Sequence, residues 1–208
     1  MFSILQAAGW PIWPLIICSV LALAIVIERF ISLREYKVAP QNLLNEVRTV
    51  TRKGLPSPDV VSQLEKSCAL GEVLASGIRA MHMDPRCSES DLHATMEGAG
   101  RVVAHKLEKY LSALATIASA APLMGLFGTV IGMIEIFGSQ APGAATGGNP
   151  AQLAHGISIA LYNTAFGLLI AIPSLIFWRY FRGIVDAYLL TLELSAEQMV
   201  RHLKAMRK

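Results

Sequence analysis

Three long stretches without a charged side chain constrain this chain more than any other feature of its sequence. No Asp, Glu, Lys or Arg occurs in Phe2–Ile27, in Tyr110–Ile134 or in Gly156–Trp178. Each stretch can supply the roughly 20 apolar residues that cross the hydrocarbon core of a bilayer as a helix. We therefore predict an all-α membrane protein with three transmembrane helices.

The positions of the basic residues predict how these helices are oriented. All eighteen Lys and Arg residues fall in Arg29–Lys109 or in Arg179–Lys208. Because loops rich in Lys and Arg stay in the cytoplasm, we place the N-terminus in the periplasm and the middle region and C-terminus in the cytoplasm of a bacterial inner membrane. The first apolar stretch has neither the basic start nor the cleavage site of a signal peptide, so we expect it to remain as an anchor. A formal charge of +3 gives no reason to expect nucleic-acid binding.

Apolar residues continue at helical spacing beyond the second and third stretches, which predicts long helices reaching into a cytoplasmic helical bundle. The stripe from Leu92 to Leu114 contains no breaker, so we expect one uninterrupted helix there. The predicted segments are a short periplasmic N-terminus (1–11), a first span (12–33), a cytoplasmic helical region (34–109), a second span (110–137), a periplasmic loop (138–152), a third span (153–181) and a cytoplasmic C-terminal helix (182–208).

Shorter helices are expected inside the cytoplasmic region. Spacing predicts one over Val38–Lys53 and one or two over Val60–Met83, with a break near Gly71. After the Asp84-Pro85 turn, Ser88 or Ser90 could cap the next helix.

The second span is rich in small residues, which lipid-facing helices do not need. Gly125, Gly128 and Gly132 lie on or near one helix face, and the last two form a small-xxx-small pair that lets another helix approach closely. The third span has a similar face. Helix packing alone would explain both faces. The residues assigned to packing are Gly125, Gly128, Gly132, Gly156, Ala160 and Gly167, with Pro122 and Pro173 as sites of a kink or of local adjustment.

Polar side chains within these small-residue faces suggest an ion pathway. Thr129 precedes Phe137 by eight residues, and Thr164 follows Leu153 by eleven, which places them about 12 and 16 Å from the outer edge. The two threonines lie on oppositely directed helices at similar depth, so they could line one path together with Asn163. A hydroxyl can order water or bind a protonated carboxyl, although it holds no charge itself at neutral pH.

Apart from Glu28, which marks the cytoplasmic edge of the first span, Glu135 is the only acid outside the predicted cytoplasmic regions. It is either a solvated carboxylate at the interface or a proton-attracting group at the outer mouth, where His155 could face it. The sequence predicts no catalytic residue, no metal site and no cofactor, because the spans hold no nucleophile–base pair and the three cysteines form no C-x-x-C. A phosphate-binding GxxxxGK[ST] is also missing, so we expect no ATP binding by that route. Because the spans hold no plausible catalytic set, we expect no enzyme.

Two motifs resemble the proton-channel family of ExbB, TolQ and MotA. APLMGLFGTVIGMI (Ala121–Ile134) resembles the second-span signature of ExbB and TolQ, and GISIALYNTAFGLLIAIPSL (Gly156–Leu175) resembles their third-span signature. The resemblance implies a pentamer around single-span helices of a partner, ExbD or TolR, which carries a membrane aspartate. It also implies that Thr129 and Thr164 meet this aspartate, and that the motion passes to TonB or TolA.

One position departs from that pattern. The best-known ExbB and TolQ members have a glutamate where this chain has Ile159, so the predicted pore holds no deep acid and a proton carrier must come from a partner. The leading hypothesis is an ExbB-like stator that uses the proton motive force to energise TonB-dependent outer-membrane transport. A TolQ-like subunit for envelope maintenance and a non-conducting membrane scaffold are the alternatives. The sequence does not distinguish protons from sodium.

Overall fold

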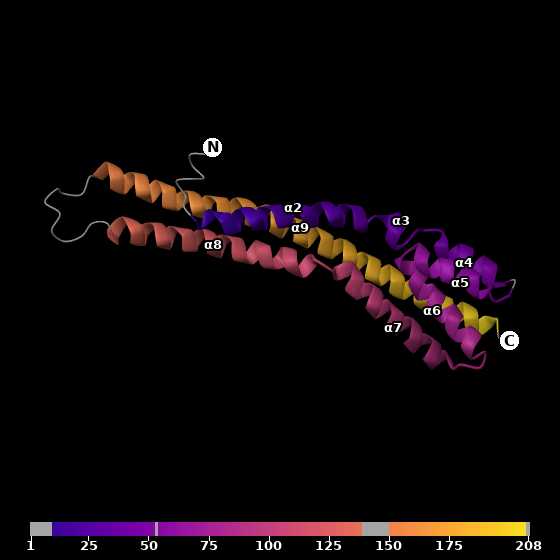
Figure 1. Cartoon of the computed structure of the whole chain (residues 1–208). Helices are drawn as coiled ribbons and strands as arrows, with labels where there is room; N and C mark the ends of the chain where they lie inside the picture. Colours follow the sequence, from indigo (N-terminus) through magenta and orange to yellow (C-terminus); the bar gives the residue numbers. More distant parts are fainter. Residues whose placement is uncertain (1–9, 53, 139–149, 207–208) are drawn as a thin grey trace. The chain divides into compact units, whose positions relative to one another are not determined.

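The computed structural model describes residues 10–52, 54–138 and 150–206, which form eight helices (Figure 1). No strand occurs among these residues, and three of the helical stretches are long and apolar enough to cross a membrane. The prediction of an all-α chain with three spans is therefore confirmed. The helices are α2 (Ile12–Ser32), α3 (Glu35–Val38), α4 (Leu43–Arg52), α5 (Pro58–Ser67), α6 (Ala69–Met83), α7 (Glu89–Glu108), α8 (Leu111–Gly138) and α9 (Pro150–Ala205).

The chain divides into two compact units. The apolar unit comprises Met1–Glu28 and Tyr110–Tyr180, and the charged unit comprises Arg29–Lys109 and Phe181–Lys208. Helices α2 and α9 run through both. The predicted N-terminal segment (1–11) and periplasmic loop (138–152) lie largely outside the described residues.

In the apolar unit, α2, α8 and α9 meet through a small buried cluster. Leu15 from α2, Ala121 from α8 and Ala171 from α9 are its buried members. Most large apolar side chains of the unit instead point outward, as Leu123 and Leu169 do, each 66% exposed. Such a surface suits a lipid environment, because lipid tails are as apolar as these side chains and exposing the side chains to them costs no free energy.

The charged unit has the core of a water-soluble helical domain. Helix α6 provides its centre, with Leu74 and Ile78 fully buried. Helices α7 and α9 supply further buried side chains, among them Met96 and Leu203. A Cβ added at Gly77 would lie 2.6 Å from Met96 Sδ, so α6 and α7 approach closely there. Each fully buried leucine or isoleucine stabilises such a core by about 1.5–3 kcal/mol.

The prediction of an uninterrupted helix into the second span was wrong. Helix α7 ends at Glu108, Tyr110 has a φ of 66°, and α8 begins at Leu111. The buried Arg29 guanidinium donates to the Leu107 carbonyl oxygen at 2.9 Å, an oxygen that a continuous helix would pair with the N–H four residues later. A long-range hydrogen bond thus takes the place of a helical one at the break.

The shorter predicted helices agree with the structure in part. Ser88 caps α7 and forms a capping box with Asp91, one of the two options predicted. The break expected near Gly71 lies at Cys68, whose Sγ accepts a hydrogen bond from the Gly71 N–H at 3.3 Å. The helix predicted over Val38–Lys53 begins only at Leu43, as α4, because Pro40 offers no backbone donor; Val38 instead ends the short helix α3.

Candidate functional site

Helices α8 and α9 approach each other closely at the glycines of α8. A Cβ added at Gly125 would lie 2.8 Å from the Asn163 carbonyl oxygen and 3.0 Å from Thr164 Cα. At Gly128 the same atom would lie 2.8 Å from Asn163 Cβ. Real Cβ atoms essentially never come so close, so these positions of α8 accept only glycine without a shift of α9.

The close approach continues along both helices. A Cβ at Gly132 would lie 3.2 Å from Ala160 Cβ, and one at Gly167 would lie 2.6 Å from the Ala121 carbonyl oxygen. Gly156 approaches the side chain of Ile136 in the same way. The small faces of the two spans therefore pack against each other within one chain, which holds the polar residues of α9 next to α8. Pro122 and Pro173 both lie inside their helices, α8 and α9 respectively.

The three polar residues predicted for a pathway differ in their surroundings. Asn163 is 2% exposed, and its Nδ2 lies against Gly128. Thr129 is half-buried, and its hydroxyl donates to the Leu126 carbonyl oxygen at 2.7 Å. Thr164 is half-buried as a residue, yet its Oγ1 is buried and has no hydrogen-bond partner within the described part of the chain.

Other predicted positions cannot be placed by their side chains. Glu135 belongs to α8, while His155 and Ile159 belong to α9, but their side chains lie outside the described residues. Their contribution to a pathway stays a prediction.

A groove between α2 and α9 was not predicted from the sequence. It has a volume of about 530 Å³ and is lined mainly by aliphatic and aromatic side chains, with Ser19 and Ser174 as its hydroxyl groups. The Ser174 hydroxyl donates to the Ile170 carbonyl oxygen of its own helix at 2.7 Å. The small residues at one face of α9 were visible in the sequence, but the shape of the α2 surface opposite them was not.

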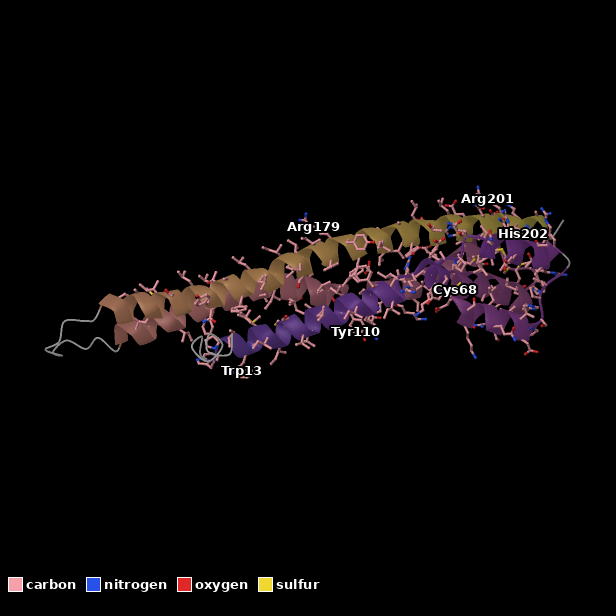
Figure 2. All side chains as sticks on the ribbon, turned by 90° about the horizontal axis from the view of Figure 1, so that it is seen from above. Trp13, Cys68, Tyr110, Arg179, Arg201 and His202 are labelled. Atoms are coloured by element: carbon pink, nitrogen blue, oxygen red, sulfur yellow. The ribbon has the colours of Figure 1, made fainter. Side chains whose placement is uncertain are left out.

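A second polar site that sequence reasoning missed joins α4 to α9. Its member on α9, His202, lies near the C-terminal end of that helix (Figure 2). The hydroxyl of the fully buried Thr51 donates to the Val47 carbonyl oxygen at 2.8 Å and lies 3.0 Å from His202 Nε2. With its proton directed to Val47, the hydroxyl can accept a hydrogen bond from Nε2. Burial, with a smaller effect of the positive charges of Arg48 and Arg52, holds the pKa of His202 below its ordinary value.

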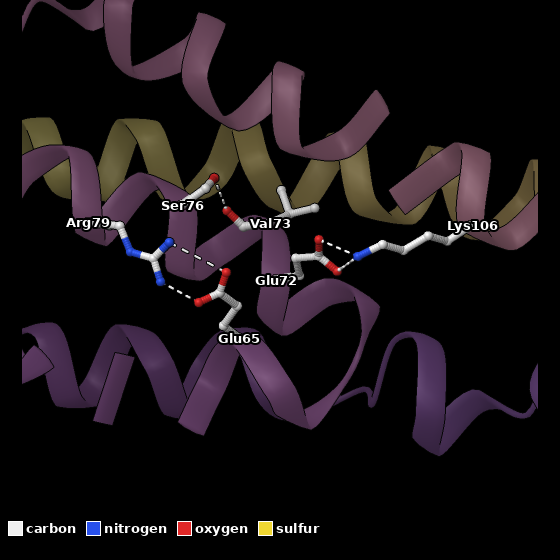
Figure 3. Close-up of polar contacts among 6 residues, drawn as sticks. All are labelled: Glu65, Glu72, Val73, Ser76, Arg79 and Lys106. Atoms are coloured by element: carbon white, nitrogen blue, oxygen red, sulfur yellow. Dashed lines mark hydrogen bonds and ion pairs between the residues drawn. The ribbon is translucent and has the colours of Figure 1, made fainter. Parts of the chain in front are cut away.

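Ion pairs connect the helices of the charged unit at its surface (Figure 3). Lys106 Nζ of α7 donates to both carboxylate oxygens of Glu72 of α6, at 2.7 and 2.8 Å. Arg79 of α6 pairs with Glu65 of α5, and its hydrogen bonds hold the pKa of Glu65 below the ordinary value. These pairs link neighbouring helices of the charged unit, and none of their residues belongs to α8 or α9. They therefore suit a structural role.

Comparison with known proteins identifies a consistent set of relatives. The model of the MotA/TolQ/ExbB proton channel family matches residues 65–194. Biopolymer transport protein exbB1 of Vibrio cholerae is 34% identical over 173 residues, which cover 81% of this chain and 73% of the relative. ExbB-like protein 3 of Synechocystis is 29% identical over 197 residues, covering 93% and 89%. TolQ of the Tol-Pal system of Pseudomonas aeruginosa is 40% identical over 98 residues, covering 44% and 42%.

Proposed function

Because the chain belongs to the MotA/TolQ/ExbB proton channel family, we propose that it is an ExbB-like subunit of a proton-driven motor in the bacterial inner membrane. The family consists of channel and motor proteins rather than enzymes, and membership implies partners of the ExbD/TolR and TonB/TolA kinds. In this proposal the N-terminus is periplasmic, and the charged unit lies in the cytoplasm, in line with the distribution of basic residues.

The proposed assembly is a ring of several copies, a pentamer by resemblance, around a single-span partner with a membrane aspartate. The outward-facing apolar side chains of α2, α8 and α9 offer surface for both lipid and neighbouring copies. The motion of the partner would pass to a TonB-like protein and energise transport across the outer membrane.

The observation that carries the proposal is the pair of neutral polar residues, Asn163 and Thr164, held against the glycines of α8. Polar groups at membrane depth are expensive and mark ion pathways. A hydroxyl and an amide accept and donate hydrogen bonds but carry no charge, so a titratable group from the partner is required for protons to move. Thr129 would form the facing part of the same pathway.

Proton flux into vesicles tests the pathway. Vesicles would contain this chain together with its single-span partner, and a pH-sensitive dye would report uptake driven by a membrane potential. The double variant Thr129→Val/Thr164→Val should abolish flux, because both hydroxyls are lost while side-chain shape is kept. Ser158→Ala is the matched control, since this exposed hydroxyl only donates to Ala154 of its own helix, at 2.9 Å. Wild-type flux in the double variant would exclude the pathway, and no flux from the intact complex would favour a non-conducting scaffold.

A TolQ-like function is the second candidate, supported by the 40% identity to TolQ over 98 residues. Complementation separates the two. Expressed with its own partner, an ExbB-like chain should restore receptor-dependent uptake in a strain without ExbB, whereas a TolQ-like chain should restore detergent resistance in a strain without TolQ.

A further inference from the structure

A cavity in the charged unit lies between α9 and the segment that joins α3 to α4. Its volume is about 330 Å³, at the lower end of the range for small-molecule sites. Its lining residues with polar side chains are Glu35, Gln41, Tyr188, Thr191 and Ser195. Leu44 of α4 and Leu70 of α6 supply apolar side chains. The cavity therefore combines one carboxylate, several hydroxyl groups and an apolar wall.

Ser195 is the lining residue whose polar group the fold leaves unsatisfied. It lies inside α9 and is 7% exposed, yet its hydroxyl has no hydrogen-bond partner within the described part of the chain. One turn earlier, the Thr191 hydroxyl donates to the Ala187 carbonyl oxygen of the same helix at 3.0 Å. A buried hydroxyl that has lost its bonds to water lowers stability unless another group binds it. The cavity is the place from which such a group can reach Ser195.

Two other hydroxyls of the lining already use their protons. Tyr188 donates to the Leu33 carbonyl oxygen at 3.1 Å, and Thr191 donates to Ala187. Toward a ligand, these two oxygens can therefore act only as acceptors, and an ionised Glu35 carboxylate also only accepts. A ligand that matches this lining must bring hydrogen-bond donors.

The charge of the lining favours a cation. Glu35 is the only charged residue among the described lining residues, and it forms no ion pair with another described residue. Its sequence neighbours Arg34 and Lys37 do not line the cavity. An anion would meet this carboxylate without a positive partner, and an apolar molecule would leave Ser195 unsatisfied. A metal ion is disfavoured because no three His, Cys, Asp or Glu side chains gather within the described ranges.

We propose that this cavity binds a small aliphatic amine in its protonated form, a primary alkylammonium. The ammonium group donates hydrogen bonds through its three N–H groups to the Glu35 carboxylate and to hydroxyl oxygens of α9, among them that of Ser195. The alkyl stem packs against Leu44 and Leu70. A ligand held in this way connects α9 with α3 and α4, so its binding stabilises the packing of these helices. Neither the proton pathway nor a partner protein is needed for this site.

Methyl NMR on the full-length chain in detergent tests the site, with n-butylammonium as the probe. Labelled leucine methyl groups place the reporters at Leu44 and Leu70, on the apolar wall of the cavity. We expect their resonances to shift in a saturable way. n-Butanol has the same stem without the charge, and butyrate is an anion. Neither should give a saturable shift at these two leucines.

Two substitutions separate the contributions to affinity. Glu35→Gln removes the charge and should weaken binding about fivefold or more. Ser195→Ala removes the unpartnered hydroxyl and should weaken binding about threefold or more, without lowering the melting temperature. Glu46→Gln is the control for the first, because this exposed carboxylate of α4 does not line the cavity. Ser76→Ala is the control for the second, because its hydroxyl donates to the Val73 carbonyl oxygen of its own helix at 2.7 Å.

Both control variants should bind n-butylammonium with wild-type affinity. The site is refuted if the probe shifts neither leucine, if n-butanol or butyrate shifts both as the amine does, or if Glu35→Gln keeps wild-type affinity. Wild-type affinity of Ser195→Ala would refute it too, because the unsatisfied hydroxyl is the feature that distinguishes this cavity from a gap filled by solvent.

Discussion

The apolar and charged units of this chain are both helical, but different forces hold their helices together. In the apolar unit the closest contacts are made by backbone and by the smallest side chains, as at Gly125, while large side chains such as Leu123 face outward. In the charged unit large side chains such as Leu74 fill the centre, and ion pairs lie at the surface.

The difference follows from the solvent of each unit. In water, burying a leucine removes apolar surface from the solvent, and this stabilises the packed state. In lipid the chains of the bilayer are as apolar as leucine, so helices gain from close approach and from polar contacts instead. The same type of substitution should therefore change the folding stability differently in the two units.

The largest contrast is expected for leucine truncation. Leu74→Ala in the charged unit should destabilise the fold by about 2–5 kcal/mol, because it leaves a cavity at a residue with 0% exposure. Leu123→Ala in the apolar unit should change the stability of the single chain little, since that side chain is 66% exposed. Urea titration of the detergent-solubilised chain, followed by circular dichroism, measures both. Equal losses of stability in Leu74→Ala and Leu123→Ala would mean that the surface of α8 around Leu123 is covered in the isolated chain.

Glycine substitution should give opposite signs. Gly125→Ala places a Cβ 2.8 Å from the Asn163 carbonyl oxygen, which forces α8 and α9 apart and should cost about 1–3 kcal/mol. Gly100→Ala lies in α7, where a Cβ would meet nothing within 4 Å, and it should stabilise the charged unit by about 0.5–1 kcal/mol. The same titration reads both variants. A stabilising Gly125→Ala would show that the contact of the two spans is looser than described.

Much of this contrast could be predicted from the sequence. The uncharged stretches gave the three spans, and the spacing of Gly125, Gly128 and Gly132 indicated a close helix contact, because both patterns depend on local composition. The break before Tyr110 could not be predicted. It coincides with a hydrogen bond from the Arg29 guanidinium to the Leu107 carbonyl oxygen, 78 positions away, and no glycine or proline marks the site.

The candidate site shows the same limit. The sequence predicts both Thr129 and Thr164 as pathway residues and does not distinguish them from each other. Their difference lies in one hydrogen bond, from Thr129 to Leu126, and in the cover that α8 places over Thr164. Side-chain rotamers of this kind depend on packing, which composition and spacing do not determine.

A pH effect on stability is expected in the charged unit, at His202. Because the pKa of His202 is lowered in the folded chain, folding favours the neutral ring. The stabilisation is complete above the ordinary pKa of 6.5. It is lost as the pH falls below that value toward the lowered pKa, because the unfolded chain binds a proton at His202 before the folded chain does. Hydrogen exchange at the C-terminal end of α9 should accelerate below that pH relative to the rest of the helix, after correction for intrinsic rates. His202→Gln keeps a donor for Thr51 but does not titrate near pH 6.5, so this acceleration should be absent in the variant.

The smallest effect is expected for the ion pair between α6 and α7. Lys106 donates to both oxygens of Glu72 at 2.7 and 2.8 Å, but its side chain is 60% exposed and that of Glu72 is 24% exposed. Solvent and salt screen a pair of this kind, so Lys106→Gln should reduce stability by about 0.2–1 kcal/mol, and less at high salt. The Glu72→Gln single variant and the Glu72→Gln/Lys106→Gln double variant complete a double-mutant cycle in the same urea titration. A coupling well above this range would mean that the pair organises the packing of α6 on α7, and then the charged unit would depend on its polar contacts as the apolar unit does.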